Sequence, residues 1–258
     1  MIKALCLKYF YLNHMSDSVI IIPTYNEIGN IETILNQIQG LNSLFDVIIV
    51  DDNSPDKTGE LVKEFISKKK YKIKLLLIER ESKNGLGSAY IEGFKKALSL
   101  NYNYIFQLDC DGSHNPDKLI EMKNSLNSSS DIVVGSRYVK GISVLHWPLS
   151  RLILSISANY YVKIITGMNL SDSTGGFNGY SKKALKSILK NNISFQGYAF
   201  QIQMKFIGNK LGYKIDEIPI IFRDREVGES KMSINIFYEA FFGILIMKIK
   251  SLFKSYKS

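Results

Sequence analysis

The sequence predicts an α/β protein whose central sheet is mostly parallel and covered by helices on both faces. The short apolar runs at 19–22 and 47–50 are rich in β-branched residues, which is typical of strands buried on both faces. Segments with helical spacing of apolar residues follow these runs, and alternation of strands and helices favours a parallel sheet. The chain has 258 residues, of which 45% are hydrophobic and only five are prolines, so it can form one such domain with an appendage.

The elements of the first half are predicted from the spacing of their apolar residues. The predicted strands are residues 19–22, 47–50, 73–78, 104–108 and 131–135. Helices with apolar residues three and four positions apart are predicted within 31–38, 61–66 and 91–98. Gly40 ends the first of these helices, and the glycine turn at 84–87 leads into the third. Because open sheets of this kind bind ligands beyond the carboxyl ends of their strands, the residues at those ends are the functional candidates.

The pattern changes in the second half of the chain. A long helical pattern covers 149–165, and a glycine-rich turn follows at 174–176. Helical patterns resume near Ala184 and Tyr198, and extended pieces occupy 214–222. No internal repeat or low-complexity segment divides the chain, so a single main domain is predicted.

The two ends are expected to lie outside this domain, which is predicted over 17–233. Residues 1–16 lack the long apolar core and cleavage site of a signal peptide and are predicted to be an N-terminal extension. Residues 234–258 are predicted to contain an amphipathic helix that docks on a membrane or a partner, because lysines follow its apolar part. Its uncharged run, 240–247, is much shorter than the roughly 20 residues that span a bilayer. Packing of this helix on the domain's own core is the alternative.

Charge and cysteine content narrow the class of partner. A formal net charge of +9 favours polyanionic partners, which are nucleic acid, anionic lipid headgroups or phosphorylated small molecules. Nucleic acid is disfavoured because the chain shows neither interleaved aromatic and basic residues nor a groove-reading motif. Cys6 and Cys110 lie far apart in the sequence, which favours a reducing compartment over a disulfide framework.

An acidic pair gives the clearest functional signal. Asp109 and Asp111 follow the predicted strand 104–108, at the point where the chain leaves the sheet. Hard divalent cations such as Mg²⁺ or Mn²⁺ take oxygen ligands and are often held by one or two carboxylates together with substrate phosphates. Solvated turn residues are the plain alternative for such a pair. Further acidic and glycine-containing segments end the other predicted strands, which places them all at the same edge.

Six segments occur in an order that resembles one known family. They are Pro23-Thr24-Tyr25-Asn26-Glu27, Val50-Asp51-Asp52-Asn53-Ser54-Pro55-Asp56, Gly85-Leu86-Gly87, Asp109-Cys110-Asp111-Gly112-Ser113-His114, Gly135-Ser136-Arg137-Tyr138 and Asp224-Arg225-Glu226-Val227-Gly228-Glu229-Ser230-Lys231. Over about 19–231 the chain resembles the dolichyl-phosphate mannosyltransferase family (polyprenol-phosphate mannose synthase, glycosyltransferase family 2), in its soluble catalytic-subunit type. The resemblance implies the glycosyltransferase A (nucleotide-diphospho-sugar transferase) fold.

The implied reaction transfers mannose from GDP-mannose to dolichyl (polyprenyl) phosphate with inversion and with Mg²⁺ or Mn²⁺. The product would be dolichyl β-D-mannosyl phosphate, the lipid-linked mannose donor for protein glycosylation and GPI-anchor biosynthesis. The acceptor phosphate is already an anion at neutral pH, so a strong general base is not required. Metal and fixed cations aimed at the departing diphosphate are the expected main source of rate.

The resemblance assigns roles residue by residue. Substrate and nucleotide binding is implied for Pro23, Tyr25, Glu27, Val50, Asp52, Asp109, Cys110, Asp111, Arg137, Arg225 and Lys231. Metal binding is implied for Asp109, Asp111 and Ser113, and catalysis for Asp111, Arg137 and Arg151. Arg137 and Arg151 are implied to lie on the acceptor side with Ser155 near them, and Arg225 and Lys231 on a loop closing over the diphosphate. Taken one at a time, these residues also have plain readings as turn residues, helix N-terminal acids or surface cations.

The chain departs from the family pattern at a few positions. Gly112 replaces a usual Leu, and Ser113 stands where some relatives have a metal-ligating Gln. Asn178 stands where relatives commonly have Arg, and Gln203 replaces a usual Glu. If the Arg and Glu of relatives form a structural ion pair, its replacement by two neutral amides would explain why both positions changed. Weakened acceptor binding is the alternative. His114 is expected to be structural or surface-exposed rather than catalytic.

Two other functions remain open. A dolichyl-phosphate glucosyltransferase would use UDP-glucose, although such relatives usually carry an N-terminal membrane segment. A catalytically silent nucleotide-sugar-binding subunit is disfavoured because the charged residues listed above are retained. The lipid acceptor implies peripheral attachment to the cytosolic face of the endoplasmic reticulum membrane, through a small membrane-anchoring subunit docked on the C-terminal segment. In a cell without that organelle, the plasma membrane takes its place.

Overall fold

The computed structural model describes residues 16–42, 44–224, 234–253 and 255–257. Its elements are, in order, β1 (Ser18–Thr24), α2 (Ile31–Gln39), β2 (Asp46–Asp51), α3 (Thr58–Ser67), β3 (Leu75–Glu79), α4 (Leu86–Ser99), β4 (Tyr104–Gln107), α5 (Lys118–Ser128), β5 (Ile132–Ser136), β6 (Val144–Leu145), α6 (Leu149–Thr166), β7 (Asn178–Ser181), α7 (Lys182–Leu189), α8 (Tyr198–Lys210), β8 (Ile215–Pro219), β9 (Phe222–Arg223) and α9 (Ile234–Phe253). All of the predicted strands are present within one or two residues of their expected bounds.

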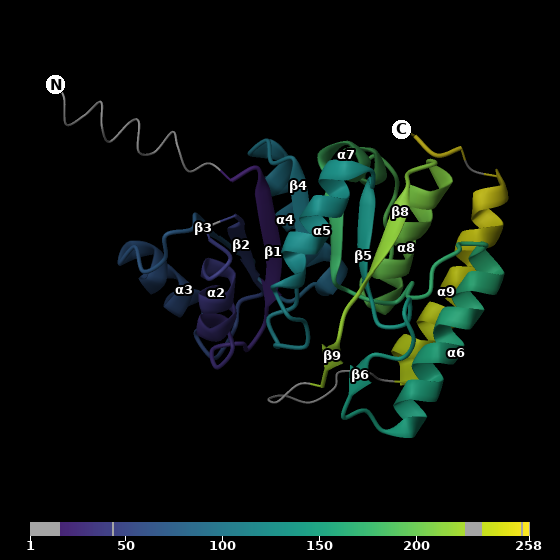
Figure 1. The fold of residues 1–258 in the computed structure, drawn as a ribbon, viewed down its shortest axis with the longest axis horizontal. Coiled ribbons are helices and arrows are strands. Elements are labelled where there is room, and N and C mark those ends of the chain that lie inside the picture. Colours follow the sequence, from purple (N-terminus) through teal and green to yellow (C-terminus); the bar gives the residue numbers. More distant parts are fainter. Residues whose placement is uncertain (1–15, 43, 225–233, 254, 258) are drawn as a thin grey trace.

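Seven strands form the central sheet in the order β3-β2-β1-β4-β7-β5-β8, seen through the middle of Figure 1. Neighbouring strands pair in parallel, except that β7 runs antiparallel to both β4 and β5. The predicted mostly parallel sheet is therefore confirmed. The strands are buried on both faces because β1 and β2 carry uninterrupted apolar residues, and all six residues of β2 are buried.

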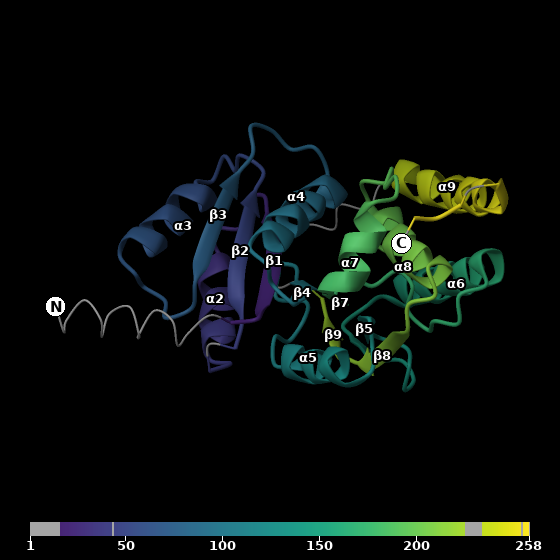
Figure 2. The same cartoon turned by 90° about the horizontal axis from the view of Figure 1, so that it is seen from above.

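Helices cover both faces of the sheet, as predicted. Apolar residues of α2, α3 and α5 pack in one core cluster, while those of α4, α7 and α8 pack in a second. Figure 2 shows α2 and α5 on one side of the sheet and α4 and α7 on the other. The alternating residues of β1 are divided between the clusters, since Ile20 and Ile22 belong to the first and Val19 and Ile21 to the second.

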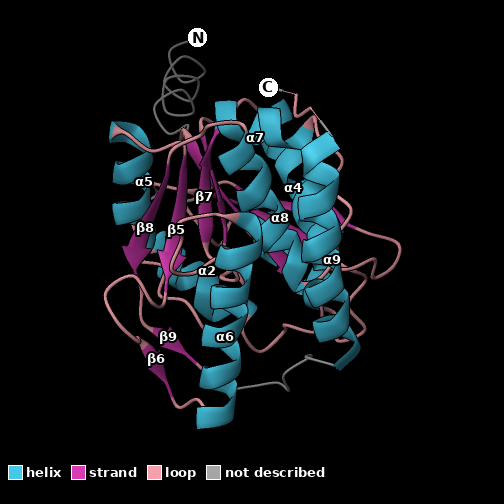
Figure 3. Cartoon of the chain, turned by 90° about the vertical axis from the view of Figure 1, so that its right-hand side faces the viewer, coloured by secondary structure: helices cyan, strands magenta, loops and turns pink. Residues whose placement is uncertain are grey.

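Helices α6 and α9 lie beside each other outside this sandwich (Figure 3). A third core cluster joins them to α8 through residues that include Val162, Phe206 and Ile244. The ring of Tyr161 stacks on Phe241 with centroids 4.5 Å apart, and the Tyr161 hydroxyl donates to the Phe241 carbonyl. The C-terminal helix therefore packs on the domain with one side.

Three elements were not predicted. Strand β7 is short and partly polar, α5 has a weakly apolar sequence, and β6 pairs with β9 in a separate two-stranded sheet.

Among the residues that the structure describes, no helix combines the length and the apolar character needed to cross a bilayer. His114 is buried against the rings of Phe177 and Phe222, with centroids 5.1 and 5.0 Å away, in agreement with its expected structural role.

Candidate active site

The candidate residues gather at the edge where the parallel strands β1, β2, β4 and β5 end. Pro23 pairs with Val50 in register, so the segments after β1 and β2 leave the sheet together. Strand β7 runs in the opposite direction, and so the glycine-rich segment 171–177 before it arrives at the same edge. The unpredicted strand thus carries this segment into the space between the acidic motif after β4 and Arg137 after β5.

The carboxylates of the acidic motif are fixed by hydrogen bonds. The Tyr90 hydroxyl on α4 donates to Asp109 Oδ1 at 2.8 Å, and Ser113 N donates to Asp111 Oδ1 at 3.0 Å. A Cβ atom added at Gly176 would lie 3.5 Å from Asp109 Oδ2. The backbone at Gly176 therefore lies beside this carboxylate.

Cys110 lies between these acids but faces the core. Its thiol is 3% exposed, so burial raises its pKa, and the nearby negative charges of Glu27 and Asp111 raise it further. Because Glu27 and Asp111 both act on the Cys110 thiol, Glu27, from the segment after β1, lies near the acidic motif after β4. Any contact of Cys110 with a nucleotide would therefore use its backbone.

The donor set of the acidic motif fits a hard divalent cation. Ser113 Oγ is buried and has no hydrogen-bond partner among the described residues, which is unusual for a hydroxyl that cannot reach water. Asp109, Asp111 and Ser113 together offer two carboxylates and one hydroxyl, the oxygen ligands that Mg²⁺ and Mn²⁺ prefer. Within the described part of the chain, no group of three or more His, Cys, Asp or Glu residues is placed to hold a metal.

Asp52, at the end of β2, forms a buried ion pair that the sequence did not reveal. Arg80 Nη1 donates to Asp52 Oδ1 at 2.6 Å, and both side chains are 7% exposed. Burial raises the pKa of Asp52, and the charge of Arg80 acts against that rise. Arg80 also donates to Ser88 Oγ at 2.6 Å. Arg80 follows β3 directly. A cation at the carboxyl end of a strand was the one feature of the sequence that could have indicated this partner for Asp52.

The segments after β1 and β2 carry further candidate residues with contacts of their own. Lys83 Nζ is 4.0 Å from the centroid of the Tyr25 ring, which is a cation–π contact. Glu27 Oε2 accepts from Asn30, and Glu27 N donates to Thr58 Oγ1. The side chain of Val50 is fully buried in the core, so only its backbone is available at the edge. The sequence had assigned no role to Lys83.

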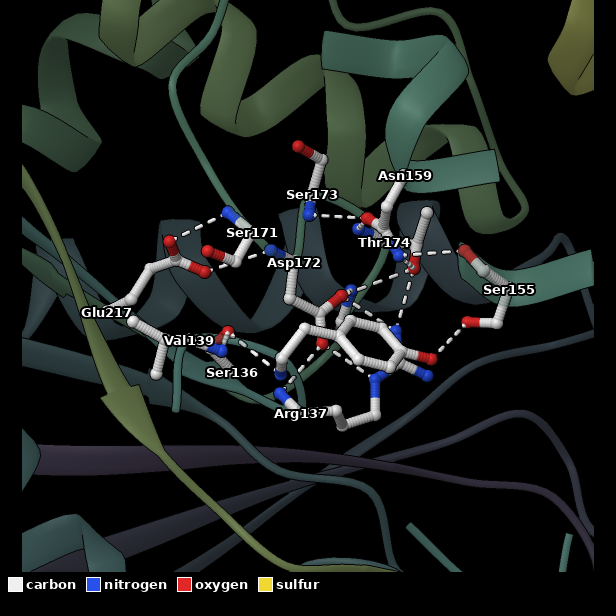
Figure 4. A network of polar contacts seen from close by, with 12 residues as sticks. Ser136, Arg137, Val139, Ser155, Asn159, Ser171, Asp172, Ser173, Thr174 and Glu217 are labelled. Carbon is white, nitrogen blue, oxygen red and sulfur yellow. Dashed lines mark hydrogen bonds and ion pairs between the residues drawn. The ribbon is translucent and has the colours of Figure 1, made fainter. Parts of the chain in front are cut away.

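Arg137 does not project into open space but is held by a fully buried acid (Figure 4). Its Nε donates to Asp172 Oδ2 at 2.6 Å and its Nη2 to Asp172 Oδ1 at 2.7 Å, which is a bidentate pair. Nη2 also donates to Thr174 Oγ1 at 2.7 Å. Burial acts to raise the pKa of Asp172, but the charge and hydrogen bonds of Arg137 more than offset it, so this pKa is lowered. The sequence indicated Arg137 and missed Asp172.

The segment that carries Asp172 is anchored from several elements. Glu217 on β8 accepts from Ser171 N at 2.7 Å and from Asp172 N at 2.9 Å. Asn159 on α6 accepts from Ser173 N at 2.7 Å, and Figure 4 shows both residues reaching the segment from opposite sides. A loop has no backbone hydrogen bonds of the kind that helices and sheets provide. Here the side chains of Glu217 and Asn159 accept from the backbone N–H groups instead, so the segment 171–176 is held in place.

Arg151 and Ser155 lie on α6. Arg151 Nη1 lies 2.9 Å from both carboxylate oxygens of Asp224, and its guanidinium carbon is 4.2 Å from the Trp147 ring centroid. The Tyr138 hydroxyl donates to Ser155 Oγ at 2.7 Å. Arg225 and Lys231 lie outside the described residues.

Among the described residues, the two amide departures have different hydrogen-bond partners, and the exchange of an ion pair for two amides stays a hypothesis. Asn178 Nδ2 donates to Gln201 Oε1 at 3.0 Å and to Gln107 Oε1 at 3.1 Å in the sheet centre. Gln203 instead accepts from the backbone of Ser194 at 3.0 Å, outside that network. Positions 201 and 203 are two apart on a helix and so face different directions.

The sheet, with the acidic motif at the carboxyl edge of its parallel strands, has the glycosyltransferase A fold of nucleotide-diphospho-sugar transferases. The family model described as "Glycosyl transferase family 2" matches residues 19–189. A polyprenol monophosphomannose synthase of Mycolicibacterium smegmatis is 36% identical over 88% of this chain and 85% of its own length. An undecaprenyl-phosphate mannosyltransferase of Micrococcus luteus is 39% identical over 85% of this chain and 89% of its own length. The chain therefore belongs to glycosyltransferase family 2, within its group of polyprenol-phosphate mannose synthases.

Solved structures share the fold at low sequence identity. Glucosyl-3-phosphoglycerate synthase of Mycobacterium tuberculosis, in complex with Mn²⁺, UDP and glucosyl-3-phosphoglycerate, superposes with a TM-score of 0.62 at 16% identity, covering 90% of this chain and 78% of that one. A mannosyltransferase of Pyrobaculum calidifontis in complex with GDP-mannose and Mn²⁺ gives a TM-score of 0.58 at 15% identity, covering 100% of this chain and 74% of that one. At these identities the comparison supports the fold alone.

Proposed function

We propose that the protein transfers mannose from GDP-mannose to a polyprenyl phosphate such as dolichyl phosphate, with inversion, and forms a β-linked mannosyl phosphate. One observation carries this proposal. The segment 171–176 passes Asp109 on one side and binds Arg137 on the other, which brings an acidic, metal-type site and a phosphate-type site into one place. A reaction between a nucleotide diphosphate sugar and a second phosphate needs both. The two relatives named as polyprenol-phosphate mannosyltransferases support the choice of substrates.

On the donor side, we assign the nucleotide to the region of Tyr25, Glu27 and Asp52. Asp109, Asp111 and Ser113 would hold Mg²⁺ or Mn²⁺, whose charge neutralises a diphosphate. The Tyr90 hydroxyl holds Asp109 in place, and the backbone N–H of Ser113 holds Asp111 in place. Mn²⁺ in two solved structures of the same fold supports a divalent metal.

On the acceptor side, we assign the lipid phosphate to Arg137 and Arg151. The phosphate oxygen that attacks is already ionised at neutral pH, so no residue has to remove a proton from it. Arg137 is held by Asp172 in one orientation, which reduces the reorganisation needed when an anion arrives. Arg225 and Lys231 stay assigned to a loop that closes over the diphosphate and excludes water.

A donor and metal panel tests this function. Purified protein with GDP-mannose, Mg²⁺ or Mn²⁺ and a short polyprenyl phosphate is expected to release GDP and form a lipid-linked mannose. UDP-glucose is expected to give at least about tenfold less product, because the relatives are mannosyltransferases and a mismatched buried polar group costs about 1–3 kcal/mol. EDTA is expected to stop the reaction. Product from UDP-glucose alone would favour a glucosyltransferase, and GDP-mannose binding without turnover would favour a silent subunit.

We further propose that α6 and α9 bring the active site to the lipid. Each helix exposes apolar residues three or four positions apart. On α6 these are Leu149 (70%), Ile153 (55%), Ile156 (39%), Tyr160 (66%) and Ile164 (61%), and on α9 they are Phe242 (55%), Ile246 (49%), Ile249 (49%) and Phe253 (87%). Such stripes with lysines beside them suit the interface of a bilayer, and α6 also carries Arg151 of the proposed acceptor side. Attachment at the cytosolic face of the endoplasmic reticulum, or at the plasma membrane in a cell without it, follows from this proposal.

Binding to vesicles tests the membrane contact. Purified protein is expected to float with vesicles of phosphatidylcholine and phosphatidylglycerol. Phe242→Asp and Ile249→Asp are each expected to weaken binding about tenfold or more, because the burial of such a side chain is worth about 1.5–3 kcal/mol. Ile120→Asp, on α5 and 39% exposed, is the matched control and should bind as wild type. No binding to vesicles, together with membrane attachment in cells, would favour a small membrane-anchoring subunit instead.

A further inference from the structure

A lysine buried in α8 contacts the segment that joins the two halves of the site. Lys205 is 0% exposed, and its Nζ donates to the carbonyl of Gly175 at 2.7 Å and to that of Ser173 at 3.2 Å. Burying a lysine is costly, because its ammonium group loses its hydration. A methionine would fill the same volume without this cost, so the position calls for an explanation beyond packing.

We propose that Lys205 is a positioning residue that fixes the segment 171–176 and thereby sets Arg137 relative to Asp109. This proposal rests on the function given above. Its two acceptor carbonyls flank Thr174, which receives a hydrogen bond from Arg137. The next residue after them, Gly176, is the one that passes Asp109. A shift of this backbone would therefore move Arg137, the proposed acceptor-side cation. The same shift would push Gly176 against Asp109, the proposed metal-binding carboxylate.

The charges around Lys205 explain how it remains buried. Arg137, Asp172 and Glu217 are the charged groups that act on it, so the cluster holds two cations and two anions. Burial lowers the pKa of Lys205 to about 7, while the charge of Asp172 opposes this shift. A neutral amine still has two N–H donors, and so the bonds to Ser173 and Gly175 can be made in either protonation state.

The other anchors of the segment cannot replace Lys205. Glu217 and Asn159 accept hydrogen bonds from backbone N–H groups at 171–174. Lys205 instead satisfies carbonyl oxygens, of which Gly175 O is otherwise bound only by Asn178 Nδ2, at 3.2 Å, among the described residues. Loss of the lysine would leave the carbonyl of Ser173 buried without this donor.

The test compares Lys205→Met and Lys205→Gln with Lys210→Met, an exposed position at the end of the same helix. Hydrogen exchange of the amides at 172–176 is expected to rise about tenfold or more in Lys205→Met, by less in Lys205→Gln, which keeps one donor, and not in Lys210→Met. With GDP-mannose, Mn²⁺ and a short polyprenyl phosphate, kcat is expected to fall about 10- to 100-fold in Lys205→Met. Its Kd for GDP-mannose should rise by a smaller factor than kcat falls, because Tyr25, Glu27 and Asp52, which we assign to the nucleotide, lie on other segments.

Several results would overturn the proposal. Unchanged exchange at 172–176, unchanged kcat, or an equal loss of donor binding and transfer would each do so. A Lys205→Met protein that does not fold would show that the lysine supports the whole domain rather than this segment, and would also overturn it. The exchange measurement uses no substrate. If wild type transfers no mannose while exchange rises as expected, the proposed function fails and the hold of Lys205 on the segment stands.

Discussion

Asp111→Ala is expected to lower kcat for mannosyl transfer by at least about a thousandfold. The substitution removes one of two carboxylates that we assign to the metal, and loss of a group that stabilises charge in the transition state costs about 10²–10³ or more. The change also removes the acceptor of Ser113 N, so the loop that carries Ser113 Oγ loses its fixed position. Single-turnover release of GDP from GDP-mannose in the presence of Mn²⁺ measures the effect.

Asp117→Ala is the matched control for this prediction. Asp117 is an exposed acid of the same loop, six residues further on, and no site role is assigned to it. Its variant should keep the wild-type rate. The two variants should also unfold within about 1 kcal/mol of wild type, since neither carboxylate is fully buried. Equal GDP release by wild type and Asp111→Ala would remove the basis of the proposed reaction.

The parallel half of the fold was predictable because its signals are local. A strand such as β2, apolar on both faces, can only be a central strand, and the acids that follow it mark the carboxyl edge. Strand β7 gave no such signal. It has four residues, and its Asn178 is buried by amide partners that come from β4 and α8, which are distant in the sequence.

The candidate site was predictable in its acids and less so in its ion pairs. Asp109 and Asp111 stand two apart after a strand, so their common location follows from the sequence. The partners of Asp52 and Arg137 do not, because Arg80 and Asp172 lie 28 and 35 residues away and meet them only through the fold. Lys205 is the sharpest case. The residues directly before and after it, Met204 and Phe206, are apolar, and nothing in the sequence shows that its side chain reaches Gly175.

Breaking the ion pair between Arg137 and Asp172 is expected to be among the most destabilising single changes in the site. Arg137→Met leaves the fully buried Asp172 without its main partner, and Asp172→Asn leaves Arg137 without its counter-charge. Each single substitution should lower the free energy of unfolding by about 3–5 kcal/mol, since one member of a buried pair then remains uncompensated. Urea denaturation at neutral pH measures both.

The double variant Arg137→Met/Asp172→Asn separates the pair from its surroundings. It should lose about 1–3 kcal/mol less than the sum of the two single variants, because removing both charges also removes the cost of a lone buried charge. The exposed pair Lys118–Glu121 provides the control, since side chains that are 36% and 51% exposed should couple by less than about 0.5 kcal/mol. Additive losses at Arg137 and Asp172 would contradict the ion pair. Coupling there, with transfer lost in both single variants, would show that one buried carboxylate both stabilises the domain and orients its acceptor-side arginine.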